Sequence, residues 1–244
     1  MQVPVTDPRI LGGEPFAGRA VVVTGGTGAL GRAVVERLLA AGARVWIPNF
    51  DARLVAEVSF AQDARVTIVE KVNLTDEVQV VAFYAGLPPL WASIHLTGGF
   101  AMTPALETSA AEFRRMFELN ATTCFLTCRE AARNMREAGQ GGRIVNVTSR
   151  AGRIPAAGMA AYSVAKLAVV GVTESLAEEF RASGILVNAV APSLMDTPDN
   201  RRAMPSADFS RWPKVDEVAR AIAFLASPDN VLTTGLVMPV YGNA

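Results

Sequence analysis

The chain is predicted to form a single α/β domain, with a doubly wound, mostly parallel sheet of seven strands and helices on both faces. Apolar, β-branched segments alternate with amphipathic segments along the chain. A glycine-rich turn joins the first apolar segment to the first helical one. The 244 residues are half hydrophobic and show no shift in composition, which suits one core. Strands that alternate with helices imply right-handed crossovers between parallel neighbours.

The predicted strands are continuous apolar runs, as expected for strands covered on both faces. They span residues 20–24, 43–47, 66–70, 92–96, 143–148, 185–191 and 235–240. Helical patterns lie between them, at residues 29–41, 52–59, 75–85, 109–138, 161–182 and 215–226. Residues 1–18 are interpreted as an N-terminal tail, and residues 19–244 as the domain, with a substrate loop at 193–214.

Charge and hydropathy exclude several classes of partner. The 23 basic and 23 acidic residues balance, and no basic stripe or polybasic cluster indicates binding to nucleic acid or to a membrane surface. The first residues lack the pattern of a secretion signal, and no apolar run reaches the roughly 18 residues that a membrane span needs. We therefore expect a cytoplasmic protein that acts on a small molecule.

The segment VVVTGGTGALG, at residues 21–31, predicts a phosphate-binding turn. Gly26, Gly28 and Gly31 fit the pattern G-x-G-x-x-G, which allows a tight turn and close approach of the backbone to a pyrophosphate. The N-terminus of the following helix presents N–H groups and a positive dipole end to the anion. An apolar strand before the turn and a helix after it are the context that this motif requires.

Ser149, Tyr162 and Lys166 predict proton-transfer chemistry. Tyr162 and Lys166 are four residues apart, so they share one face of a helix. An ammonium beside a phenol favours the phenolate and is expected to lower the pKa of Tyr162 from about 10. Such a phenol can pass a proton to or from a substrate oxygen, which the Ser149 hydroxyl can hold.

These motifs resemble those of the short-chain dehydrogenase/reductase family, over residues 18–242. The resemblance rests on TGGTGALG, on Asn120 in FELNATT, on Ser149 in VNVTSRAG, and on Tyr162 with Lys166. It implies a Rossmann fold and hydride transfer between a nicotinamide and a carbonyl or alcohol. It also implies that Tyr162 is the general acid/base, Ser149 orients the substrate oxygen, Lys166 holds the nicotinamide ribose, and Asn120 holds a water that links Lys166 to solvent.

The same resemblance implies a set of cofactor contacts. They are Gly25, Thr27, Gly28, Ala29, Leu30, Gly31, Asn49, Asp51, Asn73, Leu74, Thr97, Gly98, Gly99, Tyr162, Lys166, Pro192, Leu194 and Thr197. The chain departs from the family at some of these positions: Thr97 replaces an asparagine, and Asn73 replaces the aspartate that contacts adenine.

The residues after the second strand leave NAD(H) and NADP(H) both open. An acid there holds the ribose 2′-hydroxyl of NAD, whereas a cation accommodates the 2′-phosphate of NADP. Asn49 occupies the usual acid position, Asp51 lies nearby and Arg53 follows. Asp51 and the lack of a basic residue before Ala29 favour NAD(H) slightly.

The substrate side supports more than one interpretation. The segment 196–212 and Gly98-Gly99-Phe100 resemble dihydropteridine reductases, an NADH-using branch that typically lacks the catalytic serine. The alternatives to a general carbonyl reductase are therefore a pterin reductase and, in another class, a non-catalytic dinucleotide-binding sensor. The expected substrate contacts are Phe100, Ile154, Met195, Met204 and Trp212.

Two further predictions concern metals and assembly. Cys124 and Cys128 have the spacing of helix residues, not of a redox or metal motif, and the single histidine, His95, cannot build a catalytic zinc site. No metal is expected, and His95 is interpreted as a strand residue near the cofactor. The helix at 161–182 is apolar on more than one side, and the helix at 109–138 is long and mixed. If one face of each packs on the sheet, the surplus apolar surface predicts a homo-oligomer, a dimer or tetramer.

Overall fold

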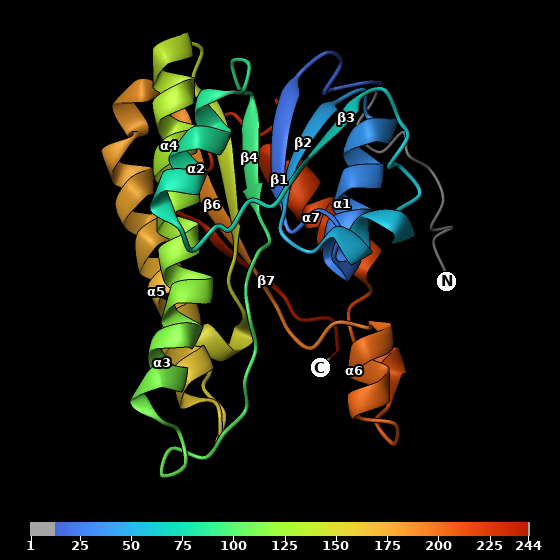
Figure 1. Cartoon of the computed structure of the whole chain (residues 1–244), viewed down its shortest axis with the longest axis vertical. Helices are drawn as coiled ribbons and strands as arrows, with labels where there is room; N and C mark the ends of the chain where they lie inside the picture. The colour runs from blue at the N-terminus through green and yellow to red at the C-terminus, as the bar shows by residue number, and fades with distance from the viewer. Residues whose placement is uncertain (1–12, 244) are drawn as a thin grey trace.

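The computed structural model describes residues 13–243 and contains one parallel seven-stranded sheet (Figure 1). The strand order is β3-β2-β1-β4-β5-β6-β7. The bounds are β1 Ala20–Thr24, β2 Arg44–Asn49, β3 Val66–Glu70, β4 Ala92–His95, β5 Gly142–Val147, β6 Ile185–Pro192 and β7 Val237–Val240. The order reverses between β1 and β4, and ligands of such sheets bind beyond the carboxyl ends of the strands at that point.

Helices cover both faces of the sheet, as predicted. They are α1 Ala29–Ala40, α2 Glu77–Ala85, α3 Ala110–Phe117, α4 Thr123–Ala138, α5 Ala160–Glu179, α6 Pro198–Ala203 and α7 Val215–Ala226. One apolar core lies between the sheet and α1 with α7, and a second lies between the sheet and α2, α4 and α5 (Figure 1). The arrangement confirms the predicted single-domain Rossmann fold.

The predicted helix at 109–138 is interrupted in the middle. A π-helical turn, η3 Glu118–Thr122, separates α3 from α4 and contains Asn120. Such turns insert an extra residue per turn and often occur at functional sites. The Asn120 amide donates to the carbonyl oxygens of Met116 at 2.9 Å and Gly99 at 3.1 Å, so its side chain is anchored.

Two other predicted segments differ in detail. Residues 52–59, predicted as a helix, form the 3-10 turn η2 Ala52–Glu57, and the remaining short turns are η4 Arg150–Gly152, η5 Arg181–Ser183 and η6 Phe209–Arg211. The segment 193–214, predicted as a loop, contains α6 and η6. Thr197 caps α6 by accepting from the Asn200 N–H, and Pro198 begins the helix, both of which favour a helix start there.

Phe16 belongs to the fold, although it lies within the predicted tail. Its side chain is fully buried in the core beneath α1, and its N–H donates to the Ala41 carbonyl at 2.9 Å. The predicted tail therefore ends before residue 16, and its residues 1–12 lie outside the described part of the chain.

Within residues 13–243, α5 alone has the length and apolar composition of a membrane-crossing helix. Half of its apolar window is buried inside the protein. Core helices meet the same criterion, so α5 is weak evidence for a membrane span.

Candidate active site

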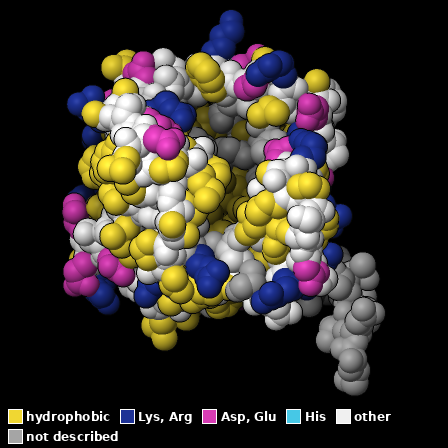
Figure 2. Space-filling view, turned by 90° about the horizontal axis from the view of Figure 1, so that it is seen from below, with side chains coloured by type: hydrophobic (Ala, Val, Ile, Leu, Met, Phe, Trp, Pro, Cys, Tyr) yellow, Lys and Arg dark blue, Asp and Glu magenta, His cyan; other side chains and the backbone are white. Residues whose placement is uncertain are grey.

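The predicted catalytic residues meet beyond the carboxyl ends of β4 and β5. Ser149 follows β5, and its hydroxyl accepts from the Ala151 N–H at the start of η4. Tyr162 and Lys166 share a face near the start of α5, which packs against η4. This end of the molecule is hollowed, and hydrophobic side chains line both walls of the hollow (Figure 2).

Burial raises the pKa of Tyr162, and the neighbouring Ser149 side chain opposes this rise. The prediction that Lys166 lowers the pKa of Tyr162 was therefore wrong. The Lys166 ammonium lies 5.9 Å from the centre of the Tyr162 ring and donates to the Val147 carbonyl at 3.0 Å.

Lys166 is a buried cation beside the backbone of Gly98. Only 6% of its surface is exposed, and burial lowers its pKa to about 8. A Cβ atom on Gly98 would lie 2.5 Å from Asn120 Oδ1 and 3.2 Å from Lys166 Nζ. The structure thus brings Asn120 and Lys166 together at Gly98, where any larger residue would have to displace the Asn120 amide.

The glycine turn has the shape of an anion cradle. Gly28 is the N-cap of α1; no side chain caps this helix and its first turn holds no acid, so its N–H groups are available to an anion. A Cβ on Gly31 would lie 2.1 Å from the Gly25 carbonyl oxygen, so the closeness of turn and helix requires glycine. These features fit the pyrophosphate of a dinucleotide.

Asn49 and Asp51 are both engaged with neighbours. Asn49 Oδ1 accepts from the Thr27 hydroxyl at 3.0 Å, which ties the glycine turn to the end of β2. Asp51 binds Arg53 through two hydrogen bonds of 2.9 and 2.6 Å, and these bonds lower the pKa of Asp51. The acid suited to NAD and the cation suited to NADP therefore neutralise each other.

The other predicted cofactor contacts border the same end of the sheet. Thr97 N–H donates to Thr24 Oγ1 at 3.3 Å, which holds the segment after β4 against the end of β1. Asn73 Oδ1 accepts from the backbone and hydroxyl of Thr75, so this oxygen is occupied by a local turn. Leu74 is buried beside it, and Pro192 ends β6. No contact with a dinucleotide is tested for these residues, so their roles stay predictions.

The five predicted substrate contacts separate into two groups. Phe100 is 61% exposed, and its ring meets the Tyr162 ring edge to face with the centroids 5.0 Å apart. Ile154 and Met204 are also exposed. Met195 instead packs against the core, and the buried Trp212 stacks on Phe209 with the centroids 5.0 Å apart. Met195 and Trp212 therefore anchor the segment 193–214.

Sequence reasoning missed two features of this site. Nothing in the pattern of residues 109–138 indicated the π-helical turn at Asn120. The pairing of Asp51 with Arg53 did have a signal, because the spacing Asp-x-Arg recurs at Asp63 and Arg65, which form the same pair of bonds.

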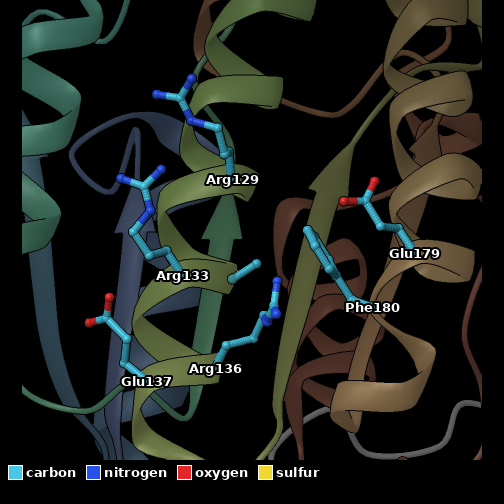
Figure 3. A pocket seen from close by; sticks show the side chains of 7 residues that line it. Arg129, Arg133, Arg136, Glu137, Glu179 and Phe180 are labelled. Atoms are coloured by element: carbon cyan, nitrogen blue, oxygen red, sulfur yellow. The ribbon is translucent and has the colours of Figure 1, made fainter.

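A separate pocket of about 450 Å³ lies between α4 and the end of α5 (Figure 3). Its labelled side chains come from α4, from Arg129 onward, and from the C-terminal end of α5, and they include Arg129, Arg133 and Arg136. It is lined by Arg129, Ala132, Arg133, Arg136, Glu137, Glu179 and Phe180. None of these is a predicted site residue, so this pocket is distinct from the catalytic hollow.

Comparison with known proteins places this site in a family. The family model described as short chain dehydrogenase matches residues 19–207. Cis-4-hydroxycyclohexanecarboxylate dehydrogenase of Sinomonas cyclohexanicum is 35% identical, over 94% of this chain and 98% of that protein. For 2,3-dihydroxy-2,3-dihydro-p-cumate dehydrogenase of Pseudomonas putida the identity is 30%, over 94% and 95% of the two chains.

A solved structure agrees with the curated relatives. The crystal structure of levodione reductase superposes with a TM-score of 0.84 at 28% identity, and covers 93% of this chain and 97% of its own. These proteins are named dehydrogenases and reductases, and they do not favour the pterin-reductase or sensor interpretations. The chain is thus an NAD(P)-dependent oxidoreductase, and it belongs to the short-chain dehydrogenase/reductase family.

Proposed function

We propose that this enzyme interconverts a secondary alcohol on a six-membered ring and the corresponding ketone. The observation that carries the proposal is the exposed Phe100 ring, set edge to face against Tyr162. The end of the molecule beyond the carboxyl ends of the strands is hollowed and has apolar walls (Figure 2). A flat or puckered ring can pack on Phe100 while its oxygen reaches the Tyr162 hydroxyl. The names of two relatives, which describe ring alcohols as substrates, support this class.

In the proposed mechanism the protein places the substrate and moves a proton. NAD(P) supplies the hydride acceptor or donor when bound. The Tyr162 hydroxyl donates its proton to the carbonyl oxygen in reduction, and takes a proton from the alcohol in oxidation. Ser149 holds the same oxygen, and its proximity to Tyr162, which is enough to affect the pKa of Tyr162, supports this role. Lys166 and Asn120, which meet at Gly98, hold the nicotinamide ribose and a water that carries the proton to solvent.

A substrate panel tests the proposal. We expect cyclohexanols and cyclohexanones to be turned over with a kcat/KM at least about tenfold above open-chain secondary alcohols and ketones of equal carbon number, a difference of about 1.4 kcal/mol. Phe100→Ala should reduce this preference, while Phe224→Ala, which truncates an exposed phenylalanine on α7, should leave it unchanged. Equal rates for ring and open-chain substrates, or turnover of quinonoid dihydropterin alone, would contradict the proposal.

We further propose that the coenzyme is NAD(H), because the Arg53 guanidinium, which could bind the 2′-phosphate of NADP, is already paired with the Asp51 carboxylate. Asp51→Ala removes a ribose partner and releases the Arg53 guanidinium for a 2′-phosphate. We expect the ratio of kcat/KM with NADH to that with NADPH to fall about tenfold or more. Asp63→Ala is the matched control, since it breaks the same kind of pair with Arg65 elsewhere. An unchanged ratio in Asp51→Ala would show that neither residue selects the coenzyme.

The enzyme is also proposed to be a cytoplasmic homo-oligomer. Oligomer formation is supported by exposed apolar side chains on three helices. They are Phe113 and Phe117 on α3, Phe125 on α4, and Val164 and Leu167 on α5. Exposed apolar surface of this kind is typical of an interface between subunits. Light scattering on the purified protein should give a mass of two or four chains, and a monomer at micromolar concentration would refute the proposal.

A further inference from the structure

Four buried side chains behind the catalytic residues form a compact cluster of nitrogen, sulfur and oxygen atoms. His95 ends β4, Asn146 is its register partner on β5, and Cys124 and Cys128 are one turn apart on α4. All four are buried. The sulfur atoms, the histidine nitrogen and the neighbouring amide oxygen therefore face one point between helix and sheet.

The distances in the cluster are those of a metal site more than of a disulfide. Cys124 Sγ and Cys128 Sγ are 4.0 Å apart, and Cys128 Sγ is 3.4 Å from His95 Nδ1 and 3.2 Å from Asn146 Oδ1. A tetrahedral zinc ion holds two sulfurs about 3.8 Å apart, and a sulfur and a nitrogen about 3.5 Å apart. The ligand atoms of His95, Cys124 and Cys128 all lie within 4.8 Å of one another.

Helix geometry separates the two possibilities. Side chains four residues apart on a helix have Cβ atoms about 5–6 Å apart. A disulfide needs Cβ atoms about 3.5–4.5 Å apart, so Cys124 and Cys128 cannot be bridged without unwinding α4. The same spacing suits two ligands of one ion, as in helices that carry paired histidines.

The neighbours of the cluster orient its ligands. Asn146 Nδ2 donates to Thr173 Oγ1 at 2.9 Å, so Asn146 Oδ1 points at Cys128 and His95. His95 Nε2 lies 2.8 Å from Ser93 Oγ, which in turn lies 3.0 Å from the Tyr84 hydroxyl. A histidine that binds a metal through Nδ1 needs an acceptor for the proton on Nε2, and Ser93 supplies it.

We propose that His95, Cys124, Cys128 and Asn146 form a buried binding site for a thiophilic divalent ion, with Zn²⁺ as the best fit. Thiolate and imidazole ligands select such ions over Mg²⁺ or Ca²⁺. Binding converts two thiols to thiolates and releases two protons, while the His95 proton moves from Nδ1 to Nε2. The two thiolates balance the charge of the ion. The prediction of no metal rested on the C-x-x-x-C spacing and on the presence of a single histidine. The fold places that histidine, His95, and Asn146 beside the two sulfur atoms.

The site adjoins the catalytic residues without belonging to them. Cys124 lies one helical turn after Asn120, which contacts the Gly99 backbone. An ion would tie the start of α4 to β4 and β5. We therefore expect it to stabilise the folded protein, since a ligand that binds only the folded state raises the unfolding temperature.

Cobalt spectroscopy on the full chain tests the proposal. After reduction and treatment with a chelator, the protein is titrated with Co²⁺ to equilibrium. We expect one Co²⁺ per chain, with a thiolate-to-cobalt charge-transfer band and the visible bands of a tetrahedral site, both removed by Zn²⁺. Zn²⁺ should also raise the unfolding temperature. Absence of the charge-transfer band, or a lower unfolding temperature with Zn²⁺, would overturn the proposal.

Variants distinguish this site from binding to scattered surface groups. Cys124→Ser and Cys128→Ser keep the size of the side chain and should each abolish the charge-transfer band or weaken binding by more than tenfold. Ser93→Ala, which removes the partner of His95, should weaken binding about 10- to 100-fold. Thr127→Ser, on the same helix but outside the cluster, is the control and should bind as the parent does. Circular dichroism confirms that each variant is folded, and a band that persists in folded Cys128→Ser would refute the assignment.

Discussion

Replacement of Tyr162 by phenylalanine is expected to reduce kcat about 10²- to 10⁴-fold in both directions of the reaction. The variant keeps the ring that packs against Phe100 but loses the hydroxyl that is proposed to exchange a proton with the substrate oxygen. Coenzyme affinity should change less than about twofold, because the glycine turn and the Asp51 region are untouched. Steady-state kinetics and a fluorescence titration with reduced coenzyme measure the two quantities.

The chain offers a matched control for this experiment. Tyr241 stacks on Arg150 through its ring, with 5.7 Å between the guanidinium carbon and the ring centre. Tyr241→Phe keeps that contact and should retain nearly full activity. If Tyr162→Phe kept more than about a tenth of the parent kcat, general acid/base catalysis by Tyr162 would be ruled out.

Replacement of Lys166 by methionine is expected to abolish most activity and yet to stabilise the coenzyme-free protein. Burial lowers the pKa of Lys166 to about 8, from 10.5 in the unfolded chain. At pH 7 the buried charge destabilises the fold by about 3 kcal/mol, at about 1.4 kcal/mol for each unit of pKa. Methionine removes the charge but loses the hydrogen bond from the ammonium to the Val147 carbonyl, worth about 2 kcal/mol for a charged donor. The net expected gain is about 1 kcal/mol.

The stabilisation expected for Lys166→Met depends on pH. Between pH 8 and 10.5 the unfolded chain binds a proton at Lys166 that the folded chain has released. The free energy of unfolding of the parent therefore rises with pH through this range, and that of Lys166→Met does not. The advantage of the variant, measured by urea denaturation, should shrink above pH 8. Lys214→Met, at an exposed position, should show neither effect.

The sequence predicted those parts of the fold that depend on local pattern. The bounds of β1, β3 and α7 were predicted to the residue, because apolar runs and helical periodicity end there at turns. The π-helical turn at Asn120 was not predicted. At this turn the Asn120 amide bonds Met116 within the helix and also Gly99, 21 residues earlier, a contact that local sequence pattern does not show.

In the candidate site, too, the local motifs were predicted and the effects of packing were not. The motifs identified Ser149, Tyr162 and Lys166, but they did not predict the direction in which the pKa of Tyr162 shifts. Burial depends on the whole packed structure, and here its effect on the pKa of Tyr162 outweighs the opposing effect of Ser149. Met195 and Trp212 were predicted as substrate contacts, with anchoring of the loop as the alternative, because composition does not distinguish an apolar lid from an apolar anchor.

The closeness of Gly98 to Asn120 and Lys166 limits how this enzyme can acquire new substrates. Any side chain at position 98 would displace Asn120 Oδ1, so mutations there remove the machinery along with the old specificity. Two residues later, the Phe100 side chain is exposed to solvent, so it can be replaced without displacing Asn120 or Lys166. Laboratory evolution toward other carbonyl compounds should therefore accumulate changes at Phe100 and Ile154 and leave Gly98 intact. A library randomised at positions 98 and 100 would show that asymmetry directly, as active clones diverse at one position and uniform at the other.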